Sequence, residues 1–177
     1  MSGTVAVRQA TADDWQAYRS LRLDALRHDP DAFGSTLERE QAMTREDWLA
    51  RLADDTGPSM IAGLDGAWVG LGGGWLYEPG RLMVVAMWTR PEARGHGVGA
   101  AVLAAVVEWA HERGLRPDLW VADDNPRARA LYERFGFRAD GTSAPLREGS
   151  LLTMSRLVLP DGPAVSPGQP LQPGRPS

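Results

Sequence analysis

The sequence predicts a single α/β domain in which about four helices flank a central mixed β-sheet. The chain has 177 residues, a length that suits one compact domain better than two. It is 43% hydrophobic and 24% charged, as expected of a globular protein that can bury a core. Predicted elements follow in the order β-α-α-β-β-β-α-β-α-β-β, which indicates a mixed sheet with helical layers.

The end of the chain differs in composition from the rest. Residues 1–159 form the expected domain, whereas residues 160–177 hold six of the thirteen prolines. Such a segment buries too little apolar surface to offset the entropy lost on ordering. We therefore expect residues 160–177 to be a disordered tail.

The first third of the domain reads as one strand and two helices. Apolar and polar residues alternate over residues 5–8 as in a short strand, and residues 13–27 follow helical spacing. Residues 28–43 are expected to be a loop. Thr44 and Asp47 then form a capping box that opens a second helix.

The remainder of the domain alternates strands with two further helices. The Asp65-Gly66 pair predicts a tight hairpin turn, Gly114 ends one helix and Pro126 opens another. The expected strands are 59–64, 67–77, 81–89, 119–121, 138–142 and 151–159, and the expected helices are 98–113 and 126–135.

Composition excludes several classes of function. A net charge of −4 gives no general attraction to nucleic acid. The sequence has no cysteine, which rules out disulfides, thiolate metal sites and cysteine nucleophiles. Its three histidines, His28, His96 and His111, stand far apart, so we expect no metal site. No run of about 18 apolar residues and no signal-like N-terminus occurs, so neither a membrane nor secretion is expected and the protein should be cytoplasmic.

A glycine-rich segment, Arg94-Gly95-His96-Gly97-Val98-Gly99, lies between a predicted strand and a long predicted helix. Alternate glycines let successive backbone N–H groups point into one concavity, and the helix adds its positive N-terminal end. This arrangement favours a phosphate-bearing ligand, although a flexible turn is the alternative interpretation. The spacing does not match the Gly-x-Gly-x-x-Gly pattern of dinucleotide-binding folds.

Two motifs together carry a family resemblance. Arg94–Gly99 matches the acyl-CoA motif Arg/Gln-x-x-Gly-x-Gly/Ala, and Asn125–Phe137 matches Asn-x-x-Ala-x-x-Leu-Tyr-x-x-x-Gly-Phe without a gap. In these features the chain resembles the GNAT superfamily of N-acetyltransferases. The resemblance covers residues 4–157 and is strongest over residues 82–138.

The resemblance implies a fold, a cofactor and a set of binding residues. The sheet should splay at a cleft for acetyl-CoA, so that the end of strand 81–89 can pair with the pantetheine arm. The pyrophosphate should rest on the glycine-rich segment. The implied cofactor-binding residues are Met87, Trp88, Thr89, Arg94, Gly95, His96, Gly97, Val98, Gly99, Asn125 and Tyr132.

Tyr132 is the expected catalytic acid. When an amine attacks an acetyl thioester a thiolate leaves, and a phenol of pKa about 10 can protonate a thiolate whose conjugate acid lies near about 8.5. A tyrosine at this position of the resembled family has that role. The alternative interpretation is a half-buried tyrosine that packs its helix against the sheet.

The general base is less clear, because residues 82–89 contain no acid where many members of the resembled family place a glutamate. Glu38 is the favoured candidate, since its loop resembles a segment near the acceptor site of some bacterial members. Glu78, Asp123 and Asp124 are the alternatives. A water relay would serve instead of any of them.

Two further patterns have structural interpretations. Most of the seven tryptophans fall in predicted helices or strands beside apolar residues and are expected in the core, with Trp88 facing the cleft instead. Residues 72–74 are three glycines inside a predicted strand, which predicts a bulge or a close approach of two backbones.

The predicted function is transfer of an acetyl group from acetyl-CoA to a primary amine of a small molecule, or to a protein N-terminus or lysine, by direct attack in a ternary complex. The mild acidic excess of residues 24–40 favours a cationic acceptor. A non-catalytic acyl-CoA sensor is the main alternative, and a nucleotide-binding oxidoreductase is disfavoured by the glycine spacing. A homodimer is one possible assembly, and the sequence does not decide the oligomeric state.

Overall fold

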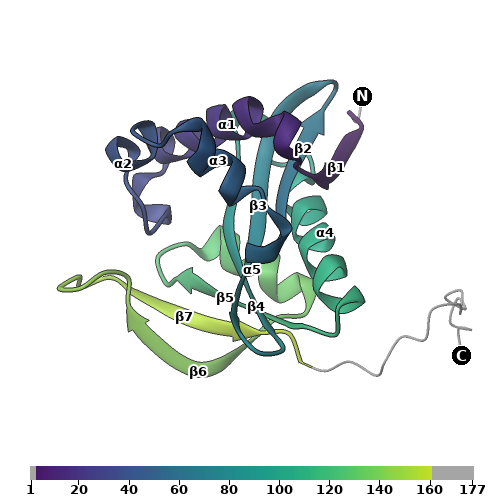
Figure 1. Cartoon of the computed structure of the whole chain (residues 1–177). Helices are drawn as coiled ribbons and strands as arrows, with labels where there is room; N and C mark the ends of the chain where they lie inside the picture. Colours follow the sequence, from purple (N-terminus) through teal and green to yellow (C-terminus); the bar gives the residue numbers. More distant parts are fainter. Residues whose placement is uncertain (1–2, 161–177) are drawn as a thin grey trace, which may run out of the picture.

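The computed structural model describes residues 3–160, which form a seven-stranded mixed β-sheet with helices on both faces (Figure 1). The strands are β1 (Val5–Gln9), β2 (Ser59–Leu64), β3 (Ala67–Glu78), β4 (Arg81–Thr89), β5 (Arg116–Ala122), β6 (Arg138–Pro145) and β7 (Thr153–Val158). The helices are α1 (Trp15–His28), α2 (Leu37–Gln41), α3 (Arg45–Arg51), α4 (Val98–Glu112) and α5 (Pro126–Phe135). The tail predicted to be disordered falls, from residue 161 onward, outside the described residues.

The sheet confirms the mixed architecture. Its strands lie in the order β1-β2-β3-β4-β5-β7-β6, and every neighbouring pair is antiparallel except β4 and β5. Two parallel strands need a crossover connection, which α4 supplies between β4 and β5.

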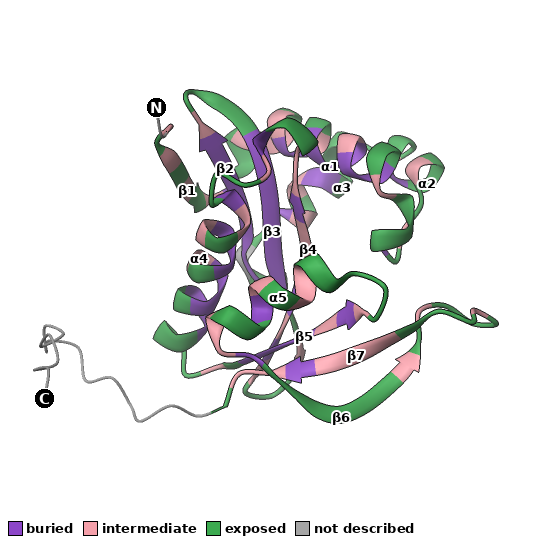
Figure 2. Ribbon diagram, turned by 180° about the vertical axis from the view of Figure 1, so that it is seen from behind, coloured by how far each residue is buried: buried purple, intermediate pink, exposed green. Residues whose placement is uncertain are grey.

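Two apolar clusters fill the spaces between the sheet and its helices (Figure 2). α4 is apolar almost all round because it packs closely on the sheet, with α5 beside it. α1 and α3 cover the other face. Strand β2 is therefore buried on both sides, which explains its continuous apolar sequence.

The sheet opens where its two parallel strands diverge. β4 and β5 pair only over Arg81–Val84 and Arg116–Leu119, although β4 continues to Thr89 and β5 to Ala122. Beyond these residues, the backbone groups of β4 and β5 that point toward each other make no hydrogen bonds between the two strands. This splay is the feature that the family resemblance implies.

A bulge shifts the register of β3 against β4 between Leu71 and Gly73, as the three glycines predict. A Cβ on Gly73 would lie 2.5 Å from the Pro58 carbonyl oxygen, so only glycine fits this close approach. On the facing strand Ala86 has a φ of 59°, a left-handed conformation that is strained for alanine. The register shift and Ala86 both lie where β4 no longer pairs with β5.

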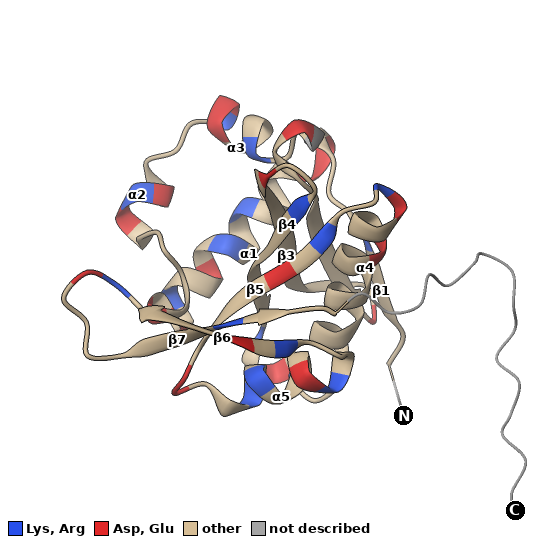
Figure 3. Ribbon diagram, turned by 90° about the horizontal axis from the view of Figure 1, so that it is seen from below, with Lys and Arg blue, Asp and Glu red and all other residues tan. Residues whose placement is uncertain are grey.

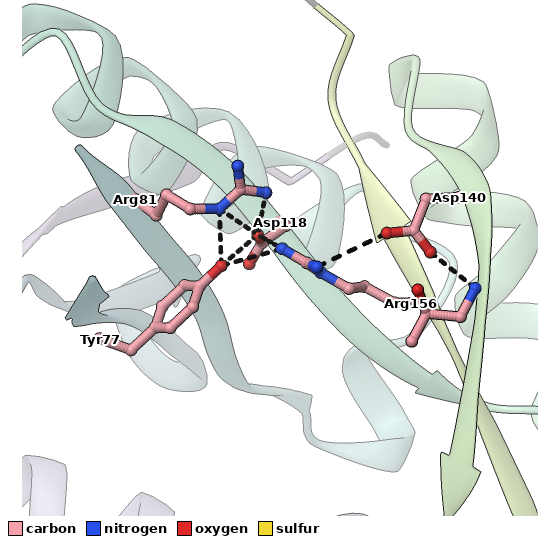
Figure 4. A network of polar contacts seen from close by, with 6 residues as sticks. Tyr77, Arg81, Asp118, Asp140 and Arg156 are labelled. Carbon is pink, nitrogen blue, oxygen red and sulfur yellow. Dashed lines mark hydrogen bonds and ion pairs between the residues drawn. The ribbon is translucent and has the colours of Figure 1, made fainter. Parts of the chain in front are cut away.

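A buried carboxylate joins β3, β4, β5 and β7 where β4 and β5 still pair (Figure 4). One oxygen of Asp118 accepts hydrogen bonds from Tyr77 Oη, from Arg81 Nη2 at 2.8 Å and from Arg156 Nη2 at 2.6 Å. Asp140 lies 3.6 Å from Arg156. Burial, and then the hydrogen bond to the carboxylate, raise the pKa of the Tyr77 phenol. The contacts fix the closed end of the sheet.

The structure corrects three local predictions. Helix α2 occupies part of the predicted loop 28–43, with Thr36 as an N-cap that accepts a hydrogen bond from the Arg39 amide. Strand β5 begins three residues before the predicted start. Trp68 and Trp75 are 37% and 57% exposed rather than in the core. No helix of the described part of the chain is long and apolar enough to cross a membrane.

Candidate active site

Two adjoining cavities occupy the opening between β4 and β5. The first, which we call the glycine-loop cavity, measures about 800 Å³ and is lined by Trp88, Arg94, Gly95, Gly97 and Gly99 among others. The second, the arginine cavity, measures about 690 Å³, and its lining includes Arg22, Arg51, Trp75, Trp120 and Arg147.

The two cavities share part of their walls. The residues common to both linings are Asp31, Ala32, Met87, Ala122, Asn125, Ala128, Tyr132 and Leu146. These residues come from the α1–α2 connection, the ends of β4 and β5, helix α5 and the β6–β7 connection. A ligand in one cavity would therefore meet a ligand in the other beside Tyr132.

The glycine-loop cavity ends at the N-terminus of α4. Gly95 and Gly97 have φ angles of 86° and 82°, which glycine adopts without strain. Gly97 is the N-cap of this 15-residue helix and has no side chain to accept a hydrogen bond from the first amide groups. These amide groups therefore face the cavity mouth without a capping side chain. An anion placed there would find backbone donors and the positive end of the helix.

The guanidinium group of Arg94 is hydrogen-bonded to the ends of α1 and β4. Its Nη2 donates to Asp29 Oδ2 at 2.8 Å, and its Nε donates to the Thr89 carbonyl at 3.0 Å. The same Asp29 oxygen accepts from Trp88 Nε1 at 2.7 Å. Asp29 thus connects the end of α1 to both the end of β4 and the start of the glycine loop. The sequence indicates Asp29 only as a helix-ending residue and as one of the acids of residues 24–40, because the partners it holds are about 60 residues away.

The structure gathers most of the remaining predicted cofactor residues. Met87, Thr89 and Val98 line the glycine-loop cavity, and Asn125 lines both cavities. Asn125 Oδ1 also accepts a hydrogen bond from the Ala128 amide at 3.1 Å and so caps α5. The cap fixes the start of the helix that carries Tyr132.

His96 and Glu38 are not brought into either lining. His96 Nδ1 lies 3.3 Å from the Ala93 carbonyl oxygen. Glu38 is exposed on α2, two residues from the fully buried Glu40. Their suggested roles stay predictions that the geometry does not support.

The other candidate bases are also displaced. Glu78 is exposed near the end of β3, and Asp124 lines only the glycine-loop cavity. Asp123 accepts hydrogen bonds from Ser155 and Thr153, which lower its carboxyl pKa. Among the described residues, the one carboxylate that lines the arginine cavity is Asp31.

Tyr132 is buried on α5 and is 8% exposed. Burial raises the pKa of its phenol to about 12. Its ring packs edge-on against Phe137 with the ring centroids 6.2 Å apart. The phenol therefore stays protonated at neutral pH, but it holds its proton more tightly than the ordinary value of about 10 assumed from the sequence.

Acidic residues of the α1–α2 region are paired with arginines. Asp24 contacts Arg90 at 2.6 Å, Asp31 contacts Arg147 at 2.7 Å, and Glu40 contacts both Arg22 and Arg51. Asp29 holds Arg94, as described above. The acidic excess counted from the sequence is thus compensated in the fold and gives the arginine cavity no acidic character.

A model of the acetyltransferase (GNAT) family matches residues 15–137. The chain belongs to this family. Within residues 3–160 of this GNAT chain, no group of three or more histidine, cysteine, aspartate or glutamate residues could hold a metal ion.

Curated relatives of this GNAT chain include two bacterial enzymes. It is 32% identical over 135 residues to the mycothiol acetyltransferase of Acidimicrobium ferrooxidans, and 33% identical over 144 residues to that of Clavibacter sepedonicus. These matches cover 72% and 78% of this chain but 41% and 44% of the relatives. The chain therefore spans less than half the length of the curated relatives it matches.

The fold is also that of solved members of the family. An acetyltransferase of the GNAT family from Streptococcus pneumoniae superposes with a TM-score of 0.71 at 20% sequence identity. The match covers 88% of this chain and 98% of that one. At this identity the likeness establishes the fold and not the substrate.

Proposed function

We propose that this chain transfers an acetyl group from acetyl-CoA to a primary amine by direct attack in a ternary complex. The observation that carries this proposal is the wall shared by the two cavities, where Tyr132 and Asn125 face both. A donor in the glycine-loop cavity and an acceptor in the arginine cavity would meet there. The chain has no cysteine that could hold an acyl intermediate, which supports direct transfer.

The glycine-loop cavity suits the shape and charge of acetyl-CoA. Amide groups at the start of α4 would bind the pyrophosphate, and the unpaired edge of β4 at Met87–Thr89 would pair with the amides of the extended arm. Asp29 would keep Arg94 and Trp88 in place beside them. When bound, acetyl-CoA supplies an acyl group activated as a thioester.

Tyr132 would assist departure of the thiolate. A phenol of pKa about 12 is a weak acid toward a thiol group of pKa about 8.5, so complete proton transfer is uphill. A hydrogen bond from the phenol still strengthens as negative charge develops on sulfur. We therefore propose that Tyr132 stabilises the leaving sulfur through a hydrogen bond. The sulfur then takes its proton from the phenol or from water.

The attacking amine must lose a proton as the new amide bond forms. Asp31 is ion-paired with Arg147 at 2.7 Å, so its carboxylate already accepts a hydrogen bond from a guanidinium group. This pairing favours a water relay through the open arginine cavity over direct transfer to a carboxylate. Glu38 has no place in this relay.

A thiol-release screen tests the function. Purified full-length chain and acetyl-CoA would be incubated with small amines, with peptides bearing free N-termini or lysines, and with the amine precursor of mycothiol. Release of CoA together with a product heavier by one acetyl group supports the proposal. Tight binding of acetyl-CoA without turnover of any amine would support the non-catalytic sensor instead.

The glycine loop gives a prediction for cofactor affinity. Gly97→Val places a branched side chain at a φ of 82° beside the first amides of α4, so both the loop conformation and the backbone approach are lost. We expect acetyl-CoA affinity to fall about tenfold or more, measured by calorimetry. Gly66→Val is the matched control, since Gly66 has a φ of 85° in the hairpin turn between β2 and β3. An acetyl-CoA affinity equal to that of the wild type in a folded Gly97→Val variant would contradict the proposal that the pyrophosphate binds at this loop.

A further inference from the structure

We infer that the arginine cavity selects an acceptor amine that also carries a carboxylate group. This inference rests on the proposed acetyltransferase function and specifies the chemistry of its acceptor. It depends on a group of three charged residues on α1, α2 and α3, two of which line the cavity. Figure 3 shows where these helices carry charged residues.

The three residues are Arg22, Glu40 and Arg51. Arg22 donates Nε to Glu40 Oε2 at 2.9 Å and Nη2 to Oε1 at 2.8 Å. Arg51 donates Nη1 to Oε2 at 2.9 Å. Arg22 and Arg51 line the cavity, whereas Glu40 is fully buried behind them.

Two guanidinium groups share one carboxylate, so the trio retains one positive charge. The described residues offer no hydrogen-bond acceptor to Nη1 of Arg22 or to Nη2 of Arg51, so each arginine keeps donors for a ligand. Arg22 is only 8% exposed, and a partly unpaired guanidinium with so little contact with water attracts an anion more strongly than a surface arginine does.

Aromatic rings hold both guanidinium groups in place. Arg22 stacks over Phe33 with its Cζ atom 4.4 Å from the ring centroid, and Arg51 stacks over Trp48 at 4.9 Å. A planar guanidinium that is already fixed loses little freedom when it binds a carboxylate. The trio is therefore a preorganised site rather than a pair of mobile surface charges.

No other group in the lining reverses this charge. Asp31 and Arg147 neutralise each other through their ion pair. The rest of the wall offers an apolar surface, with Met83, Trp120 and Met154 in the lining. A cationic acceptor such as a polyamine would be repelled. An amine joined to a carboxylate by an apolar chain can pair its carboxylate with the two arginines while the chain lies against the apolar part of the wall.

Matched pairs of amines test the inference. The probes are 4-aminobutanoate, 6-aminohexanoate and L-phenylalanine, each compared with its uncharged carboxamide. Both the rate constant kcat/KM with acetyl-CoA and the calorimetric affinity for the full-length protein holding CoA are measured. For at least one pair, we expect the acid to exceed its amide about tenfold or more in both quantities, since the acid gains a charge-assisted hydrogen bond.

Arg51→Met removes the excess charge and leaves the two hydrogen bonds between Arg22 and Glu40 intact. We expect it to abolish most of the preference for acid over amide. Because Arg51 is part of the stack on Trp48, thermal unfolding would verify that the variant is folded. Arg19→Met is the control, because it removes one positive charge from α1 outside both linings, and the preference should persist.

The two measurements separate failure of this inference from failure of the proposed function. Acetylation of amines without preference for the acids, or a preference that survives in Arg51→Met, would overturn the inference and leave the function standing. Acids that bind in an Arg51-dependent manner but are never acetylated would support the site and refute the enzyme. Equal binding of acids and amides in the absence of turnover would refute both.

Discussion

Replacing Tyr132 by phenylalanine should lower kcat about 100-fold while leaving the affinity for acetyl-CoA nearly unchanged. The substitution removes one hydroxyl group and keeps the ring that packs against Phe137. The lost hydrogen bond matters mainly when charge develops on the leaving sulfur, so the loss belongs to kcat. Water can replace part of this stabilisation, which places the effect at the low end of the range for acid catalysis.

The pH dependence of kcat adds a second readout for Tyr132. Burial raises its pKa to about 12, so the phenol keeps its proton up to about pH 10. We expect no alkaline decline in the wild-type kcat below that pH, whether or not the amine itself titrates. A decline with an apparent pKa near 9 that disappears in Tyr132→Phe would show that bound substrates lower this pKa.

Tyr77→Phe is the control for losing a phenol elsewhere in the fold. Tyr77 lies in the Asp118 network and lines neither cavity. Its substitution should leave kcat unchanged at temperatures where the variant is folded. Full activity in Tyr132→Phe would remove this residue from the mechanism, and an equal loss in both variants would indicate a general effect on the sheet.

The parts of the site that the sequence predicts are local in the chain. The glycine loop, the helix that follows it and the start of α5 at Pro126 each arise from residues within one turn or a few positions of one another. Backbone conformation at Gly95 and Gly97 follows from residue type, because a left-handed φ favours glycine. The bulge at residues 72–74 also follows from residue type, because glycines inside a strand indicate a close approach of two backbones.

The arginine cavity is not predictable in this way. Arg22 and Glu40 are 18 positions apart, and Arg51 is a further 11 positions along the chain. In sequence all three look like solvated charges, since nothing local indicates which surface helices meet. Thr36, followed by residues with good helix propensity, is the one signal that could have identified α2.

Glu38 and Glu40 show why an unrecognised helix leads to errors in assigning site residues. Two positions along an α-helix rotate the side chain by about 200°, so neighbouring acids face opposite ways. Glu40 is fully buried, whereas Glu38 is exposed. The sequence pointed to Glu38 as the acid of interest in this segment, but the acid that the fold buries is Glu40, because the helix that sets the two apart was not recognised.

Glu40→Gln should destabilise the fold by about 3–5 kcal/mol at pH 7, which urea unfolding would measure. Burial alone would raise the carboxyl pKa, but hydrogen bonds from Arg22 and Arg51 outweigh it and hold the pKa of Glu40 at about 2. Glutamine fits the same space without the charge. It therefore leaves the buried Arg22 and the half-buried Arg51 without a counterion. Removing one partner of a buried ion pair destabilises a fold because the remaining charge is uncompensated.

The same pair fixes the direction of the pH dependence. The folded pKa of about 2 lies below the ordinary value of 4.5, so the unfolded chain binds more protons between these two pH values. The stabilisation by Glu40 is therefore complete above about pH 4.5 and is lost as the pH falls toward 2. We expect the difference in unfolding free energy between wild type and Glu40→Gln to shrink steadily over that window. Glu38→Gln, on the exposed face of α2, should change stability by less than about 0.5 kcal/mol at every pH. A wild-type advantage that stays constant down to pH 2.5 would show that packing rather than charge makes Glu40 important.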